Sequence, residues 1–138
     1  MALFRLIYVS SARQQLSDPE LDDILESAVR HNTPQGITGM LLYCDGNFMQ
    51  VLEGEEAAVD ETYGRICRDR RHYDIHLIEK EPIGCRDFPG WAMAFRRLAR
   101  QEAASHPAYA PLIESRFDPG LVGATPGLAT ELLKRFCR

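Results

Sequence analysis

A β-hairpin turn near the middle of the chain constrains the fold more than any other feature. Asp45–Gly46 separates two mostly apolar runs, residues 36–43 and 47–53. Asp-Gly is a favoured pair in two-residue hairpin turns, because both turn positions adopt positive φ angles. We therefore expect two neighbouring antiparallel strands on either side of this turn.

Helical patterns flank the hairpin on both sides. Ser17 and Glu20 match a capping box, and the apolar residues that follow recur at the spacing of one helical face. This helix should end near Asn32–Thr33–Pro34, because the residue before a proline resists helical geometry. A second helix should open at Gly54–Glu55–Glu56, where acidic residues favour a helix amino terminus, and end near Arg71.

Three further apolar segments are predicted to be strands. They are residues 3–10, residues 76–78, with a stop at Pro82, and residues 91–95. The resulting order, β-α-β-β-α-β-β, contains two crossover units that share one sheet. This is the α+β ferredoxin-like plan, in which both helices lie on the same face of the sheet.

The composition changes from about residue 99 onward, where Ala, Glu and Leu dominate and prolines punctuate the segment. We predict one domain over residues 1–98 and a C-terminal helical extension over residues 99–138, built from two short helices. An amphipathic extension must bury its apolar stripe, either on the uncovered face of the sheet or on another subunit. The same stripe favours a homo-oligomer, either a dimer or a larger ring.

Composition and charge argue against several classes of protein. The formal net charge is −4 and no long block of like charge occurs, so we expect no nucleic-acid binding. The apolar runs are far shorter than the roughly 20 residues of a membrane-spanning helix, and the amino end does not look like a signal peptide. The four cysteines lack the spacing of zinc ligands. We therefore expect thiols in a cytoplasmic protein with no bound metal and no membrane association.

Three polar residues occupy positions where the pattern favours apolar ones: Tyr8 and Gln50 on strand faces, and Asn32 at the end of the apolar helical stripe. A buried amide without a partner costs roughly 1–3 kcal/mol, so Gln50 needs a partner. The two amides and the phenol could converge on the helix side of the sheet. Taken singly, Tyr8 is also explained as a packing residue and Asn32 as a helix cap.

Two other pairs are equally open to more than one interpretation. Arg65 and Asp69 lie four residues apart on the second predicted helix and are either site residues or a surface pair. Trp91 and Met93 alternate along a strand and would ordinarily belong to the core.

Several short motifs follow one another along residues 3–98. They are Tyr8-x-Ser10, His31–Asn32, Gly36–Ile37–Thr38–Gly39, Phe48-x-Gln50-x-Leu52–Glu53–Gly54, Arg65-x-x-x-Asp69, His72 and Trp91-x-Met93. In this order and spacing they resemble the BLUF domains, the flavin-binding blue-light sensors. The extension resembles that of short BLUF proteins, which carry no fused enzyme, and a chain of 138 residues leaves no room for a cyclase or phosphodiesterase domain. One departure is Ala92, where many relatives carry serine.

The resemblance implies a non-covalently bound oxidised flavin between the two helices, FAD with FMN as the alternative. It assigns cofactor binding to Tyr8, Ile24, Asn32, Gln50, Arg65, Ile66 and Asp69. Asn32 and Gln50 would hydrogen-bond the polar edge of the ring. An amide suits such an edge because it both donates and accepts hydrogen bonds.

The resemblance also implies a photochemical switch in place of catalysis. The excited flavin would take an electron and a proton from Tyr8 through Gln50. Reversal of this transfer would leave Gln50 rotated or tautomerised beside an oxidised flavin with slightly red-shifted absorption. The change would pass to Trp91 and Met93, either of which could approach Gln50, and the extension would relay it to a downstream signalling protein.

Two alternatives remain at this point. The ferredoxin-like scaffold is also that of small hydrolases of the acylphosphatase type, although the sequence offers no Gly-rich phosphate loop and no clear nucleophile–base pair. The second alternative is a ligand-free interaction module that oligomerises through its extension.

Overall fold

The structure of the chain is a computed structural model that describes residues 2–99, 101–102, 107 and 109–136. Its strands are β1 (Leu3–Ala12), β2 (Thr38–Cys44), β3 (Asn47–Glu55), β4 (His72–Ile83) and β5 (Ala94–Arg97). Its helices are α1 (Asp18–Gln35), α2 (Glu56–Cys67), α4 (Ala110–Glu114), α5 (Pro119–Ala124) and α6 (Leu128–Phe136) within those ranges. None of the helices in the described ranges combines the length and the apolar character needed to cross a membrane.

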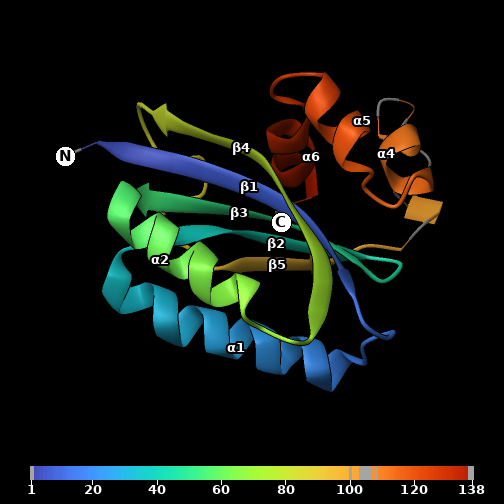
Figure 1. Ribbon diagram of the computed structural model, residues 1–138, viewed down its shortest axis with the longest axis horizontal. Coiled ribbons are helices and arrows are strands. Elements are labelled where there is room, and N and C mark those ends of the chain that lie inside the picture. Colours follow the sequence, from blue (N-terminus) through green and yellow to red (C-terminus); the bar gives the residue numbers. More distant parts are fainter. Residues whose placement is uncertain (1, 100, 103–106, 108, 137–138) are drawn as a thin grey trace.

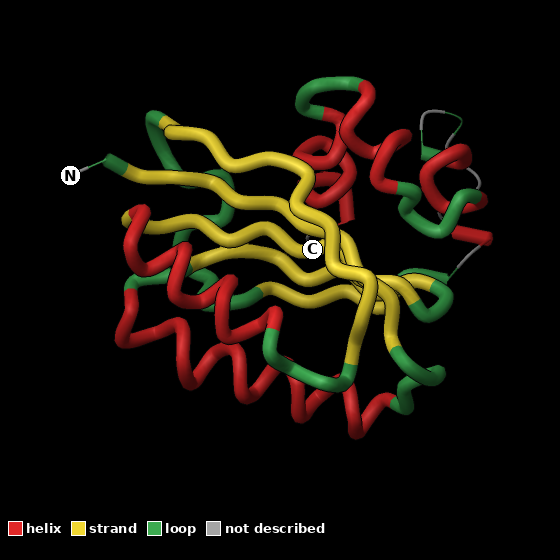
Figure 2. The backbone as a smooth tube through the Cα atoms, viewed as in Figure 1, coloured by secondary structure: helices red, strands yellow, loops and turns green. Residues whose placement is uncertain are grey.

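The five strands form one mixed sheet in the order β4-β1-β3-β2-β5. Neighbouring strands pair antiparallel, except that β5 runs parallel to β2. Helices α1 and α2 cover one face, the helix side, and α4, α5 and α6 pack against the other, the tail side (Figures 1 and 2). This arrangement confirms the predicted ferredoxin-like α+β fold.

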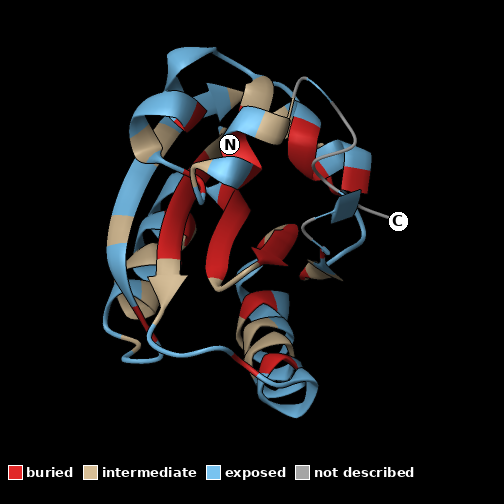
Figure 3. Cartoon of the chain, turned by 90° about the vertical axis from the view of Figure 1, so that its right-hand side faces the viewer, coloured by how far each residue is buried: buried red, intermediate tan, exposed pale blue. Residues whose placement is uncertain are grey.

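The hairpin between β2 and β3 forms as its turn residues predict. Asp45 and Gly46 have φ angles of 51° and 83°, and the strands pair directly from Cys44 and Asn47 onward. Because side chains alternate along a strand, residues of opposite parity enter different cores. On β1, Leu6 packs on the helix side, whereas Ile7 packs on the tail side. Figure 3 shows the buried residues concentrated in these central strands.

Helix α1 begins as predicted but ends later. The capping box between Ser17 and Glu20 is complete. At the other end the helix continues through Pro34 to Gln35, so the predicted end at residues 32–34 was slightly early. Gly36 adopts a left-handed conformation, and its N–H donates to the carbonyls of the last turn. This cap closes the helix although Pro34 contributes no N–H.

Helix α2 ends at Cys67. The sequence had predicted a later end, near Arg71, and this prediction was wrong. The Asp69 carboxylate accepts a hydrogen bond from the backbone N–H of Arg71, at 2.9 Å, and forms a tight turn into β4. Strand β4 therefore starts at His72 and continues through Pro82. A proline is tolerated there because β4 is an edge strand, which needs no second row of hydrogen bonds. Strand β5 begins at Ala94, so Trp91 precedes it.

Residues 109–136 of the extension contain three helices, whereas two were predicted for the whole extension. Arg116 and Phe117 both have positive φ angles, and this turn separates α4 from α5. The apolar residues of these helices join the tail-side core, where Leu132 and Phe136 cluster with Met40. The apolar stripe is thus buried on the second face of the sheet of the same chain, one of the two locations that the sequence allowed.

Candidate cofactor-binding site

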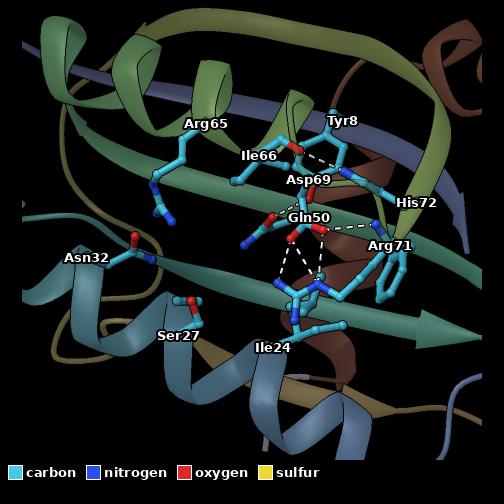
Figure 4. A pocket seen from close by; sticks show the side chains of 13 residues that line it. Tyr8, Ile24, Ser27, Asn32, Gln50, Arg65, Ile66, Asp69, Arg71 and His72 are labelled. Carbon is cyan, nitrogen blue, oxygen red and sulfur yellow. Dashed lines mark hydrogen bonds and ion pairs between the residues drawn. The ribbon is translucent and has the colours of Figure 1, made fainter.

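A cleft lies on the helix side of the sheet, between α1 and α2 (Figure 4). The space between its walls is about 580 Å³, including the open solvent at its mouth. It is lined by Tyr8, Ile24, Ser27, Ala28, Asn32, Leu41, Phe48, Gln50, Arg65, Ile66, Asp69, Arg71 and His72. The cleft therefore brings together all seven residues that the sequence assigned to cofactor binding.

Gln50 lies at the floor of the cleft on β3 and is only 4% exposed. Its Oε1 accepts a hydrogen bond from the hydroxyl of Tyr8, its direct cross-strand partner on β1. Its Nε2 donates to the sulfur of Met93 at 3.3 Å. Met93 is thus the neighbour of Gln50, whereas Trp91 is 47% exposed. A thioether is a weak acceptor, so the amide has one strong and one weak partner.

Tyr8 is buried, with 3% of its surface exposed, and its ring lies beside that of Tyr63 on α2. Burial, more than any neighbouring group, raises the pKa of Tyr8 far above that of an ordinary phenol. Tyr8 consequently keeps its proton at physiological pH and acts as a hydrogen-bond donor to Gln50. The Tyr63 ring of α2 lies 5.6 Å from the Tyr8 ring, and its own pKa is raised to about 12, mainly by burial.

Asn32 lies in the last turn of α1 and is buried. Its Nδ2 donates to the backbone carbonyl of Ala92 at 2.9 Å, so the side chain does not cap the helix. Its Oδ1 is buried without a hydrogen-bond partner among the described residues. Such an atom carries a desolvation cost unless another molecule supplies a donor.

Arg65 extends from α2 toward the same space that Asn32 faces from α1 (Figure 4). Its Nε is buried and has no hydrogen-bond partner in the part of the chain that the structure describes. Burial is the main cause that lowers the pKa of Arg65 from its usual value. Arg65 and Asn32 thus offer an unused donor and an unused acceptor on opposite walls of the cleft.

Asp69 pairs with Arg71, and among the described residues it forms no ion pair with Arg65, which removes the surface pair that the sequence had left open as an alternative. The Arg71 Nε lies 3.0 Å from both Asp69 oxygens. The hydrogen bonds from Arg71 are the largest cause that holds the pKa of Asp69 below its usual value. The sequence did not predict Arg71 as a lining residue, because the second helix was expected to end near it. The Asp69-x-Arg71 spacing after the helix is the sequence feature that could have predicted this turn and the position of Arg71.

His72 belongs to the sequence motifs, but its structural role was not predicted. Its Nε2 lies 2.8 Å from the carbonyl oxygen of Ile66, and its Nδ1 lies 2.7 Å from the Ser10 hydroxyl. A carbonyl only accepts hydrogen bonds, so Nε2 carries the proton. The ring therefore joins β1 to the end of α2 and fixes the wall that Ile66 forms.

These residues fit a planar ligand with a polar edge. Ile24 and Ile66 provide apolar walls above the sheet, and Leu41 lies at its floor. The unsatisfied Oδ1 of Asn32 and Nε of Arg65 match the donors and acceptors along the edge of an isoalloxazine ring. The donor set and the cleft thus agree with the flavin that the sequence implies.

Comparisons with known proteins point to the same chemistry. A family model described as BLUF, sensors of blue-light using FAD, matches residues 3–94. The photoactivated adenylate cyclase subunit beta of Euglena gracilis is 39% identical over 92 residues, which make up 66% of this chain and 11% of that protein. The chain therefore spans only a small part of the length of this curated relative.

Two solved structures resemble nearly the whole chain. The dark state of BlrB, a BLUF protein, has a TM-score of 0.73 and 34% identity, and the match covers 98% of this chain and 94% of that one. The photo-activated state of BlsA has a TM-score of 0.82 and 28% identity, with the same coverage of 98% and 94%. These matches include the extension as well as the sheet and its two helices.

Proposed function

The chain belongs to the BLUF family, the sensors of blue light using FAD, and on this premise we propose that Tyr8, Gln50 and Met93 form its light switch. The observation that carries the proposal is the continuous hydrogen-bonded series from the Tyr8 hydroxyl through the Gln50 amide to the Met93 sulfur. Tyr8 and Gln50 line the cleft in which we place the flavin.

Cofactor binding is proposed to rest on the unsatisfied groups of the cleft. Asn32 Oδ1 would accept from the polar edge of the ring, and Arg65 would donate to it. Ile24 and Ile66 would enclose its faces, with the Asp69–Arg71 pair at one side of the cleft. We take FAD as the ligand, as the family description gives it. When bound, the flavin supplies light absorption and, in its excited state, a strong one-electron oxidant.

The hydrogen bonds around Gln50 suggest how a change in this site can persist after the flavin has absorbed light. Tyr8 is buried and protonated. If its phenol loses an electron, its proton must therefore pass to a neighbouring group, and the hydrogen-bonded neighbour is Gln50. Rotation of the Gln50 amide exchanges Oε1 and Nε2 between the positions facing Tyr8 and Met93. The NH₂ group would then donate to Tyr8, and Oε1 would face a sulfur that cannot donate to it. The two arrangements differ in hydrogen bonding, and this difference can bias a partner.

This function is that of a sensor module and not of a catalyst. The enzyme named among the relatives is far longer than this chain, which spans 11% of it. We propose that the chain is non-enzymatic and signals through its extension to a separate protein in the cytoplasm. The free thiols of Cys67 and Cys85 support a reducing compartment. No structural observation favours the acylphosphatase alternative.

The test is the absorption spectrum of the flavin-loaded protein before and after blue illumination. We expect a reversible shift of the flavin bands to longer wavelength. Tyr8→Phe should keep the flavin and lose the shift, because the phenyl ring fills the same space without a transferable proton. Tyr73→Phe, at an exposed tyrosine of β4, is the matched control and should behave as the parent. A normal shift in Tyr8→Phe would contradict the proposed role of Tyr8.

A further inference from the structure

Glu53 is a fully buried carboxylate on the tail side of the sheet. It is 0% exposed and lies three residues after Gln50 on β3, so its side chain points to the opposite face. The neighbouring positions Met49 and Val51 on this face are apolar core residues. A buried charge is costly unless it is paired and hydrogen-bonded, so the contacts of Glu53 identify its role.

Three donors surround this carboxylate. The Thr38 hydroxyl donates to Oε1 at 2.9 Å. The backbone N–H of Asp87 donates to Oε2 at 2.6 Å, and that of Phe88 donates to Oε1 at 3.1 Å. The Arg86 guanidinium donates to the Thr38 hydroxyl and to the Glu53 carbonyl, at 2.8 and 2.9 Å. Glu53 thus holds the backbone of the segment between β4 and β5, residues 84–93, which we call the β4–β5 segment.

The same segment reaches the light switch only a few residues later. The Trp91 carbonyl accepts from the backbone N–H of Gly39 at 3.1 Å, and the Ala92 carbonyl accepts from Asn32. Met93 then accepts from Gln50. The approach is close, because a Cβ on Gly39 would lie 2.0 Å from the Val51 carbonyl oxygen and 3.3 Å from the Met93 methyl group. The position of Met93 is therefore sensitive to the path of the whole segment.

The first half of the segment is held on the tail side of the sheet. Phe88 is buried in the tail-side core, and its N–H is one of the donors to Glu53. The Asp87 carboxylate receives Arg5 at 3.2 Å and Lys134 of α6 at 3.5 Å. Glu53 thus fixes the point at which one segment contacts both the extension and, further along, the switch.

We propose that Glu53 is a positioning residue that holds the β4–β5 segment on the path that brings Met93 to Gln50. The proposal rests on the proposed function of Gln50 and Met93. Glu53 touches neither the cleft nor these two side chains, and it acts on them through backbone hydrogen bonds to the intervening segment. Glu53→Gln keeps the size of the side chain but places an NH₂ group where one of the surrounding donors needs an acceptor.

The first measurement is hydrogen exchange of the flavin-loaded protein in the dark. Glu53→Gln should speed exchange in the peptide that covers residues 84–93, because the NH₂ group that replaces one carboxylate oxygen cannot accept a hydrogen bond from Asp87 or Phe88. The matched control is Glu55→Gln, an exposed glutamate on the same strand, which should leave this exchange unchanged. If Glu53→Gln fails to fold, Thr38→Val removes one of the three donors and should give a smaller change of the same sign. Unchanged exchange in the folded variant would overturn the proposal.

The second measurement is a double-mutant cycle on the dark-recovery rate of the flavin spectrum. Met93→Leu removes the sulfur that accepts from Gln50 and should therefore change the recovery rate. Glu53→Gln should change this rate severalfold, in the same direction as Met93→Leu does. If Glu53 acts through Met93, the double variant should recover as Met93→Leu does, and not with the product of both effects. Independent, multiplicative effects would overturn the proposal.

Failure of the proposed function is distinguishable from failure of this inference. If Met93→Leu leaves recovery unchanged while Glu53→Gln still speeds segment exchange, the role of Met93 in the switch is wrong and the positioning role falls with it. If Met93→Leu alters recovery and Glu53→Gln does not, the switch stands and the positioning role is overturned. The fluorescence of Trp91, the sole tryptophan, offers a further readout, because it should shift in Glu53→Gln and not in Glu55→Gln.

Discussion

Gln50 and Glu53 are buried polar side chains on opposite faces of the same strand, and they differ in how completely they are hydrogen-bonded. On the helix side, Gln50 has one strong partner and one weak sulfur acceptor, and Asn32 retains an unused oxygen. On the tail side, Glu53 accepts hydrogen bonds from three donors beside the apolar core residues Met49 and Val51. A buried polar group that lacks some of its hydrogen bonds can rearrange or bind a ligand, whereas a fully hydrogen-bonded group fixes the backbone around it.

The largest expected effect comes from removing the group that can rearrange. Gln50→Leu should bind flavin and fold, yet lose the light-induced spectral shift completely, because no amide remains to exchange its partners. Met49→Leu, at the adjacent position on the tail side, should keep the shift, since a swap of similar volume is well tolerated. Absorption spectroscopy under blue light measures both. A spectral shift that persists in Gln50→Leu would show that the Gln50 amide is not the group that rearranges.

The apolar packing of the tail side should govern stability and leave the light-induced spectral shift intact. Leu132→Ala removes a fully buried side chain of α6 and should lower the free energy of unfolding by about 2–5 kcal/mol. The control is Leu121→Ala, at an exposed leucine of α5, which should cost far less. Urea unfolding gives both values, and the parent's spectral shift should survive under native conditions. A loss of the shift in a folded Leu132→Ala protein would show that the faces are coupled more tightly than proposed.

The unused oxygen of Asn32 should matter for affinity more than for stability. Asn32→Ala should weaken flavin binding by roughly tenfold at most, the equivalent of one net hydrogen bond. Asn47→Ala is the control, because Asn47 is also buried but bonds Ser11 outside the cleft. Titration of flavin-depleted protein with FAD measures the two dissociation constants. Equal affinities in the two variants would argue against ring binding by Asn32.

The smallest effect concerns the Asp69–Arg71 pair and depends on pH. The pKa of Asp69 is lowered from 3.8, chiefly by hydrogen bonds from Arg71. The pair therefore contributes stability that is fully present above pH 3.8 and lost as pH falls through the lower folded-state pKa. Asp69→Asn should be less stable than the parent near neutral pH, and the gap in unfolding midpoint should narrow on acidification. Asp22→Asn, at an exposed position of α1, should show no such gap. A constant gap at all pH values would contradict this account.

The fold was predictable to a large extent because its signals are local. The Asp45–Gly46 turn and the Ser17 capping box act over a few residues, and both formed as expected. The boundaries that were wrong depend on neighbours more distant in the chain or on turn chemistry. Pro82 lies inside a strand because β4 is at the edge of the sheet, and α2 ends early because Asp69 turns back to Arg71.

The candidate site was predictable in its residues but not in their pairing. Polar side chains at apolar positions marked Tyr8, Asn32 and Gln50, and the cleft contains all three. Periodicity could not tell which of Trp91 and Met93 lies beside Gln50. It also gave no reason for a charged residue at Glu53, because nothing nearby in the sequence indicates which distant amides will meet that carboxylate.

Local sequence patterns were enough to predict the alternation of strand faces, the hairpin, the capped first helix and the polar groups on the helix side. Tertiary structure alone decided that Met93 meets Gln50, that Asn32 bonds Ala92 and that the extension lies on the sheet of its own chain. The difference arises from the distance along the chain over which each interaction acts. Backbone propensity and side-chain period act between residues a few positions apart, whereas these pairings join segments that only the closed sheet brings together.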